Sequence, residues 1–146
     1  MATADTTTPK RSPAGEAWAL MHELFVSQRG RFLAIASEFE LSPPQLGALK
    51  ALEPGRPVAM SELATILACD NSNVTGIIDR LEDRGLVERR SAEHDRRVKM
   101  LVVTPAGQEL RERLVERMSQ PPPALAALST GEQRALRNLM RRALRR

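Results

Sequence analysis

The segment from Ser61 to Gly85 constrains the fold more than any other part of the sequence, because it predicts two short helices separated by a tight polar turn. The second helix follows a break at 70–72, where Asp70 or Asn71 can cap it, and Gly85 lies where a left-handed C-terminal cap is needed. Two helices joined in this way are typical of a helix-turn-helix. Their expected buried residues are Leu63, Ala64 and Leu67 in the first helix, and Val74, Ile77, Ile78 and Leu81 in the second.

The outward side of the second helix carries short side chains that suit an approach to DNA. These are Ser72, Asn73, Thr75 and Gly76, with Arg80 one turn further on. Asparagine can bind adenine through two hydrogen bonds, so Asn71 and Asn73 are candidates for reading bases, and Arg80 is better placed for a phosphate or a guanine. The alternative interpretation is that Ser72 and Asn73 only complete the N-terminal cap of the helix.

Two strand-like segments follow, Leu86–Arg90 and Val98–Val103, and the polar residues 91–97 lie between them. This pattern predicts a β-hairpin wing with a charged tip. Asp95 stands two residues before Arg97, and we expect its carboxylate to hold the guanidinium so that Arg97 enters a narrow minor groove. The alternative is a solvated run of charges. The candidate DNA contacts are Ser61, Asn71, Ser72, Asn73, Thr75, Gly76, Arg80, Arg90, Asp95, Arg96 and Arg97.

The distribution of charge is more informative than the net charge of +4. Residues 132–146 hold six arginines and one acid, so the rest of the chain is close to neutral. Residues 84–99 form a second basic cluster, with six basic and three acidic side chains. The prediction of a nucleic-acid partner therefore depends on the motifs and their placement.

Composition indicates one mainly helical domain, to which the two strand-like segments add a small antiparallel β-hairpin. The 146 residues include no Tyr, and aromatic residues total 3%, so we expect an aliphatic core. The single cysteine, Cys69, excludes an internal disulfide framework and a multi-cysteine zinc site, and we expect no metal and no cofactor. No apolar run has the length of a membrane span or a signal peptide, so a cytoplasmic location is expected.

Helices are also expected on both sides of this central region. Apolar residues from Trp18 to Phe39 recur at helical spacing and predict one long helix interrupted only by Gly30, after a disordered arm at residues 1–13. Ser42-Pro43 and Thr104-Pro105 each predict a helix start, and prolines 121–123 must break the chain. Ser129 and Glu132 match a capping box at the start of an Arg-rich last helix.

Residues from about Leu41 to Glu109 resemble the winged-helix core of the MarR family of bacterial transcriptional regulators. The matching stretches are LSPPQLGALKAL, SELATILACDNSNVTGIIDRLEDRGLVERR and HDRRVKMLVVTPAGQEL, in the family's order and spacing. The resemblance implies a homodimer in which residues 14–40 and 105–146 form the dimerisation region and residues 41–104 form a winged helix-turn-helix. It also implies a repressor that binds an inverted repeat in double-stranded DNA, with residues 71–80 in the major groove and residues 91–97 in the minor groove.

Regulators of this family usually respond to a small molecule or to cysteine oxidation. By this resemblance Trp18, His22 and Phe25 could line an effector cleft, although such a stripe is more often core or dimer interface. Cys69 is better interpreted as a buried structural thiol than as a sensor. Motifs of enzyme sites are absent from the sequence. The remaining alternative is a winged-helix module that binds proteins without specific DNA binding.

Overall fold

The computed structural model describes residues 12–145. Most of the arm expected at residues 1–13 lies outside these described residues. Contacts divide the described chain between Arg31 and Phe32 into a small N-terminal unit and a larger unit. No helix within residues 12–145 is both long enough and apolar enough to cross a membrane.

The first helical region consists of two helices where the sequence predicted one. Helix α1 spans Pro13–Ser27 and helix α2 spans Arg29–Glu38, with Gln28 between them. Gly30, the expected interruption, lies inside α2. Helix α1 has no buried residue, and only Ile35 and Ala36 of α2 are buried. Few side chains on either side of Gln28 are buried among the described residues, so core packing does not impose one continuous helix there.

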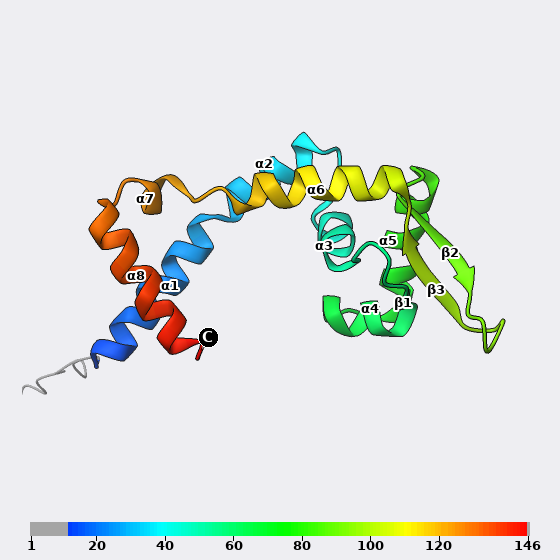
Figure 1. The fold of residues 1–146 in the computed structure, drawn as a ribbon, viewed down its shortest axis with the longest axis horizontal. Helices are drawn as coiled ribbons and strands as arrows, with labels where there is room; N and C mark the ends of the chain where they lie inside the picture. Colours follow the sequence, from blue (N-terminus) through cyan, green and yellow to red (C-terminus); the bar gives the residue numbers. More distant parts are fainter. Residues whose placement is uncertain (1–11, 146) are drawn as a thin grey trace, which may run out of the picture. The chain divides into compact units, whose positions relative to one another are not determined.

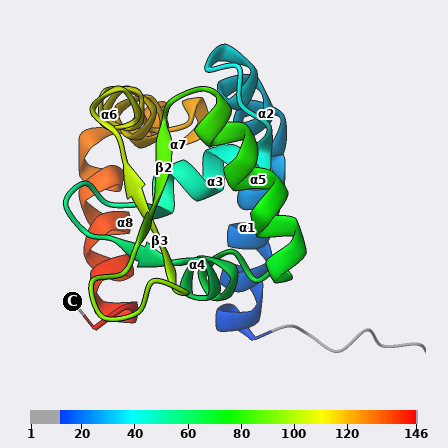
Figure 2. The same ribbon diagram turned by 90° about the vertical axis from the view of Figure 1, so that its right-hand side faces the viewer.

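Three helices form the centre of the larger unit: α3 at Pro43–Ala51, α4 at Met60–Leu67 and α5 at Asn71–Asp83. They pack against one another next to the sheet (Figure 2). Ser42 and Gln45 form a capping box at the start of α3. The expected buried residues are confirmed at Leu63, Ala64, Val74, Ile78 and Leu81, whereas Leu67 and Ile77 are partly buried at the edge of the core. Leu46, Leu49 and Leu52 are buried in the same core.

The sheet has three antiparallel strands, β1 at Val58–Ala59, β2 at Val87–Ser91 and β3 at Lys99–Val103, in the order β1-β3-β2. Strands β2 and β3 form the predicted hairpin, which we call the wing together with the connecting residues 92–98. The sequence analysis missed β1, which is only two residues long and pairs with Met100 and Leu101. The wing extends away from the helices, with its turn outermost (Figure 1).

Helix α6 spans Pro105–Ser119, and its first turn packs closely against the backbone that precedes β2. Thr104 caps it by accepting a hydrogen bond from the Gly107 amide at 3.0 Å, and the Thr104 hydroxyl donates to the Gly85 carbonyl at 2.6 Å. The carbonyl of Leu86 approaches Gly107 so closely that a Cβ there would lie 1.9 Å from it. Glycine is therefore required at this crossing.

The prolines at 121–123 end α6 as expected. A short helix, α7, spans Pro123–Ala126, and α8 spans Thr130–Ala143. The predicted capping box is present, since Ser129 accepts from the Glu132 amide and Glu132 accepts from the Ser129 amide. Helix α8 has no buried residue, and Leu136, Leu139 and Leu144 remain exposed.

Candidate nucleic-acid interface

The turn before α5 leaves the polar side chains at its N-terminus available. Ala68 takes a left-handed conformation with φ of 50°, and Asp70 is the N-cap residue. The Asp70 carbonyl accepts hydrogen bonds from the amides of Asn73 and Val74, at 3.0 and 3.1 Å. Within residues 12–145, no hydrogen bond or ion pair holds the side chain of Ser72 or Asn73. The interpretation that these two side chains complete the cap is therefore wrong.

The outward face of α5 is polar, small and open to solvent. Its side chains do not contribute to the core, which contains Val74, Ile78 and Leu81 from the opposite side of the helix. The Thr75 hydroxyl donates to the carbonyl of Asn71 at 3.0 Å, so its proton is satisfied within the helix. A Cβ at Gly76 would meet nothing within 4 Å, so the helix surface is open there. The exposed residues of this face are Asn71, Ser72, Asn73, Thr75, Gly76 and Arg80.

Ser61 lies on a neighbouring element, in the first turn of α4. It is exposed, and its backbone carbonyl accepts a hydrogen bond from the Thr65 hydroxyl at 3.1 Å. The sequence predicted that Ser61 begins α4, but the helix starts one residue earlier, at Met60. The Ser61 hydroxyl is therefore not a cap, and its DNA contact stays a prediction.

At the wing tip, Asp95 acts on the backbone of Arg97. Its carboxylate Oδ1 accepts a hydrogen bond from the Arg97 amide at 2.9 Å, and the Asp95 carbonyl accepts from the Val98 amide at 3.0 Å. None of the ion pairs among the described residues joins Asp95 to Arg97. The expected grip of the carboxylate on the guanidinium is therefore wrong. Instead, Asp95 shapes the turn, and Arg96 and Arg97 project from it exposed.

The structure divides the basic cluster at 84–99 into side chains that have a partner among the described residues and side chains at the wing tip that do not. Arg84 donates to the carbonyls of Glu40 at 2.7 Å and Phe39 at 3.4 Å, so it connects the end of α5 to the residues after α2. Arg90 pairs with Glu88, its neighbour on the same face of β2, and both side chains are substantially exposed. Lys99 donates to the Ser91 hydroxyl at 3.1 Å. Cations without such partners in the described wing are therefore concentrated at its tip.

Arg89 forms an ion-pair network that sequence reasoning missed. From β2, its guanidinium reaches Asp79 at 2.5 Å and also pairs with Glu82, both on α5. Partial burial lowers the pKa of Arg89, but the hydrogen bonds and negative charges of Asp79 and Glu82 more than compensate, so the pKa is raised above its ordinary value. The spacing of Asp79 and Glu82 shows that both acids can face one cation, but it does not identify Arg89 as that cation.

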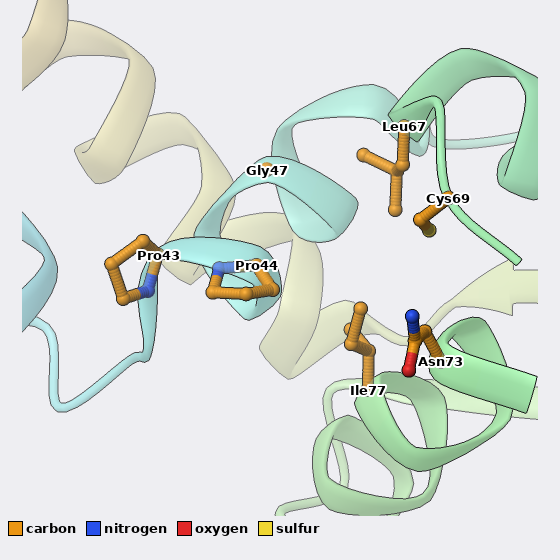
Figure 3. Close-up of a pocket in the computed structure, with 7 residues that line it drawn as sticks. All are labelled: Pro43, Pro44, Gly47, Leu67, Cys69, Asn73 and Ile77. Carbon is orange, nitrogen blue, oxygen red and sulfur yellow. The ribbon is translucent and has the colours of Figure 1, made fainter.

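A pocket of about 470 Å³ lies between α3 and the helix-turn-helix (Figure 3). Leu67 and Cys69 face Asn73 and Ile77 across it, and prolines 43 and 44 lie at another side. Cys69, the single cysteine of the sequence, is half-buried against the edge of the core and lies at the pocket wall, so it is not fully buried as the sequence predicted. Among the described residues, no group of His, Cys, Asp and Glu could hold a metal ion.

The three residues predicted for an effector cleft lie on α1, in the small N-terminal unit. Trp18 is 69% exposed and Phe25 is 76% exposed, and His22 is exposed as well. These side chains are therefore available for contact with another molecule, and their role in ligand binding stays a prediction.

Comparison with known proteins places this interface in a family context. Residues 41–99 match the model of the MarR family. The chain is 40% identical to the transcriptional repressor MprA of Escherichia coli (strain K12) over 87 residues. The matched region covers 59% of this chain and 49% of MprA. It is 28% identical over 102 residues to the uncharacterized HTH-type transcriptional regulator YfiV of Bacillus subtilis (strain 168), covering 70% of this chain and 64% of YfiV. The chain thus spans less than two thirds of the length of either relative.

The fold is also found among solved structures. A mutant of MarR from E. coli superposes with a TM-score of 0.79 at 22% identity, covering 92% of this chain and 98% of that chain. A MarR family protein from Bacillus stearothermophilus superposes with a TM-score of 0.76 at 24% identity, covering 90% and 93%. These similarities confirm the predicted fold, which is mainly α-helical with a winged helix-turn-helix.

Proposed function

Because the chain belongs to the MarR family, we propose that it is a transcriptional regulator that binds double-stranded DNA as a homodimer and acts as a repressor. The observation that carries the proposal is the pairing of two exposed surfaces in one unit. One is the polar face of α5, and the other is the wing tip with Arg96 and Arg97. Both curated relatives are named as transcriptional regulators, and no catalytic role is proposed.

Helix α5 is suited to the major groove. The side chains of Ser72 and Asn73 carry hydrogen-bonding groups with no partner among the described residues, so they are free to meet base edges. Gly76 leaves space for close approach of the helix backbone. Arg80, one turn further on and exposed, is placed for a phosphate or a guanine. In this arrangement residues 71–80 read the base sequence and also help to position the protein on the DNA.

The wing is suited to the minor groove. Asp95 fixes the backbone of the turn through the Arg97 amide, while the guanidinium groups of Arg96 and Arg97 remain exposed. A narrow minor groove attracts arginine through its enhanced negative potential. Arg90, which pairs with Glu88 and lies one residue before the end of β2, is proposed as a phosphate contact. The same charges make the tip a poor contact for an apolar protein surface, which disfavours the protein-interaction alternative.

The homodimer is supported by the apolar side chains that α1 and α8 leave exposed. On α1 these are Trp18, Leu20, Met21, Phe25 and Val26, and on α8 they include Leu136 and Leu139. Exposed apolar groups in such number on two helices are typical of a surface that another chain covers. We therefore propose that residues 14–40 and 105–146 form the dimerisation region and residues 41–104 the DNA-binding domain.

Trp18, His22 and Phe25 are proposed as part of an effector site at the dimerisation region. The support is that the three residues follow one another on α1 at spacings of four and three, so they share one side of the helix beside the proposed dimer surface. Trp18 is the single tryptophan of the chain. Its fluorescence therefore reports directly on a ligand that binds near it. A library of small apolar molecules, screened for quenching and for release of DNA, tests the site. Compounds that release DNA without changing Trp18 emission would place the effector elsewhere.

The experiment that tests the function is selection of duplexes from a random pool at physiological salt, followed by footprinting of the selected site. Two recognition helices related by a two-fold axis should enter successive major grooves about 34 Å apart, so the selected site should be an inverted repeat of roughly 16 to 20 base pairs. Sedimentation of the free protein should show a dimer. A pool with no enriched sequence, or a monomer in sedimentation, would contradict the proposal.

A further inference from the structure

The wing and α5 are joined by a second connection besides the covalent turn at Gly85. Arg89 lies opposite Leu101 in the β2–β3 ladder, so the two side chains share a face of the sheet. Leu101 is fully buried, which directs that face toward the helices. The Arg89 side chain is only 23% exposed, and its guanidinium extends to the carboxylates of Asp79 and Glu82 on α5.

Glu82 holds Arg89 at two points. One carboxylate oxygen pairs with the guanidinium, and the other accepts a hydrogen bond from the Arg89 amide at 3.3 Å. The guanidinium also reaches the Thr75 carbonyl, at 3.5 Å. Because Thr75, Asp79 and Glu82 follow one another at helical spacing, these contacts span two turns of α5. A planar guanidinium held by two carboxylates has little rotational freedom, unlike a single exposed ion pair.

We propose that the network of Arg89, Asp79 and Glu82 is a positioning clamp that fixes the angle between α5 and the wing, so that one DNA site is read in both grooves at once. The proposal rests on the proposed function. Arg89 is a positioning residue in it, since its guanidinium is occupied by the protein and does not contact DNA. The structural reason is that the wing is a two-stranded extension whose tip is far from the core, so a small rotation at its base displaces Arg97 by a larger amount.

The clamp also neutralises acids on a DNA-facing helix. Asp79 is 56% exposed and stands one residue before Arg80, where an unpaired carboxylate would repel phosphates. Pairing with Arg89 removes this repulsion while leaving Arg80 available. The clamp therefore has a second consequence for DNA affinity, of a purely electrostatic kind, and a test must separate the two effects.

Glu82→Gln removes one charge and weakens the clamp while keeping the shape of the side chain. The matched control is Glu88→Gln, because Glu88 pairs with Arg90 on β2 and contacts no residue of α5 in the ion pairs of the described chain. Both variants change the net charge by one unit, so an effect common to both is electrostatic. Arg89→Lys keeps the charge but loses the planar fork, and it serves as a second variant if Glu82→Gln is poorly folded.

The first measurement is a double-mutant cycle on the selected duplex, with Arg97→Ala made in the wild-type, Glu82→Gln and Glu88→Gln proteins. We expect Arg97→Ala to weaken binding about tenfold in the wild type and in Glu88→Gln. In Glu82→Gln it should weaken binding less than about threefold, because the wing is already misplaced. The same factor for Arg97→Ala in all three backgrounds would overturn the proposal. Additive losses of this kind are expected if the network only stabilises the fold and does not position the wing.

The second measurement does not depend on DNA. Spin labels at Ser72→Cys and Glu93→Cys, in a Cys69→Ser protein diluted with unlabelled chain, report the distance distribution between α5 and the wing tip. The distribution should broaden in Glu82→Gln and in Arg89→Lys and stay narrow in Glu88→Gln. Unchanged distributions would overturn the clamp. If the wild-type protein binds no specific DNA, the proposed function fails, and the spin-label distances still decide whether the clamp sets the geometry.

Discussion

Replacing Gly107 by alanine tests how the wing is fastened to α6. The new Cβ would lie 1.9 Å from the Leu86 carbonyl oxygen, 2.8 Å from its carbon and 3.0 Å from a methyl group of Val103. Close carbon–oxygen contacts are about 3.3 Å, so Leu86 and Gly107 must separate by roughly 1.4 Å. Two hydrogen bonds depend on this approach, from the Thr104 amide to Leu86 at 3.1 Å and from the Thr104 hydroxyl to Gly85 at 2.6 Å.

The magnitude follows from three terms. Overpacking costs ~1–3 kcal/mol, and disturbance of the two hydrogen bonds costs ~1 kcal/mol each. Alanine in a helix recovers ~1 kcal/mol relative to glycine. The net loss in the free energy of unfolding is therefore about 3 kcal/mol, which for a chain of this length lowers Tm by roughly 6 to 12 °C.

The assay is urea and thermal unfolding followed by circular dichroism. The matched control is Gly131→Ala, because Gly131 lies in the first turn of α8 and a Cβ there would meet nothing within 4 Å. The control should be neutral or slightly more stable than the wild type. A Gly107→Ala protein as stable as the control would refute the close approach of α6 to the start of β2.

Three further predictions concern charge. Arg96→Ala should reduce the slope of log K against log salt for DNA binding by about 0.9, the release expected for one phosphate contact, and an unchanged slope would exclude such a contact. Arg84→Ala should lower the free energy of unfolding by about 1 kcal/mol, since the carbonyls of residues 39 and 40 lose their donor, whereas Arg80→Ala should leave urea unfolding unchanged. Hydrogen bonds from the Ser129 hydroxyl and amide lower the pKa of Glu132 from 4.5, so its contribution to α8 is full above 4.5 and is lost as pH falls through the lowered pKa. Glu132→Gln should remove that part of the acid dependence of helicity, and an identical acid transition in both proteins would contradict this.

The helix-turn-helix could be predicted from sequence because local chemistry and packing agree there. Val74, Ile78 and Leu81 recur at helical spacing and are all fully buried, and Gly85 takes the expected left-handed conformation with φ of 69°. The caps at Ser42, Thr104 and Ser129 were equally visible, since each places a hydroxyl three residues before the amide that it accepts from. Where local backbone chemistry and core packing favour the same structure, the sequence is sufficient to predict it.

Long-range partners could not be predicted in this way. Nothing near Arg89 in the sequence distinguishes it from Arg90, yet one pairs with α5 and the other with its own strand, because successive residues of a strand point to opposite faces. The role of Asp95 was misjudged for a related reason. An aspartate in a tight turn can accept a hydrogen bond from the backbone amide two residues later. Asp95 makes this local bond to the Arg97 amide and not the expected ion pair with the Arg97 guanidinium.

The central claim is that the polar face of α5 reads bases, and Asn73 tests it most directly. The measurement is the affinity of the wild type and of Asn73→Ala for a panel of duplexes in which each base pair of the selected site is changed singly. The account predicts that Asn73→Ala loses a preference of ~1–3 kcal/mol at one base position and keeps the preferences elsewhere. A panel in which Asn73→Ala and the wild type show the same preference at every position would contradict it.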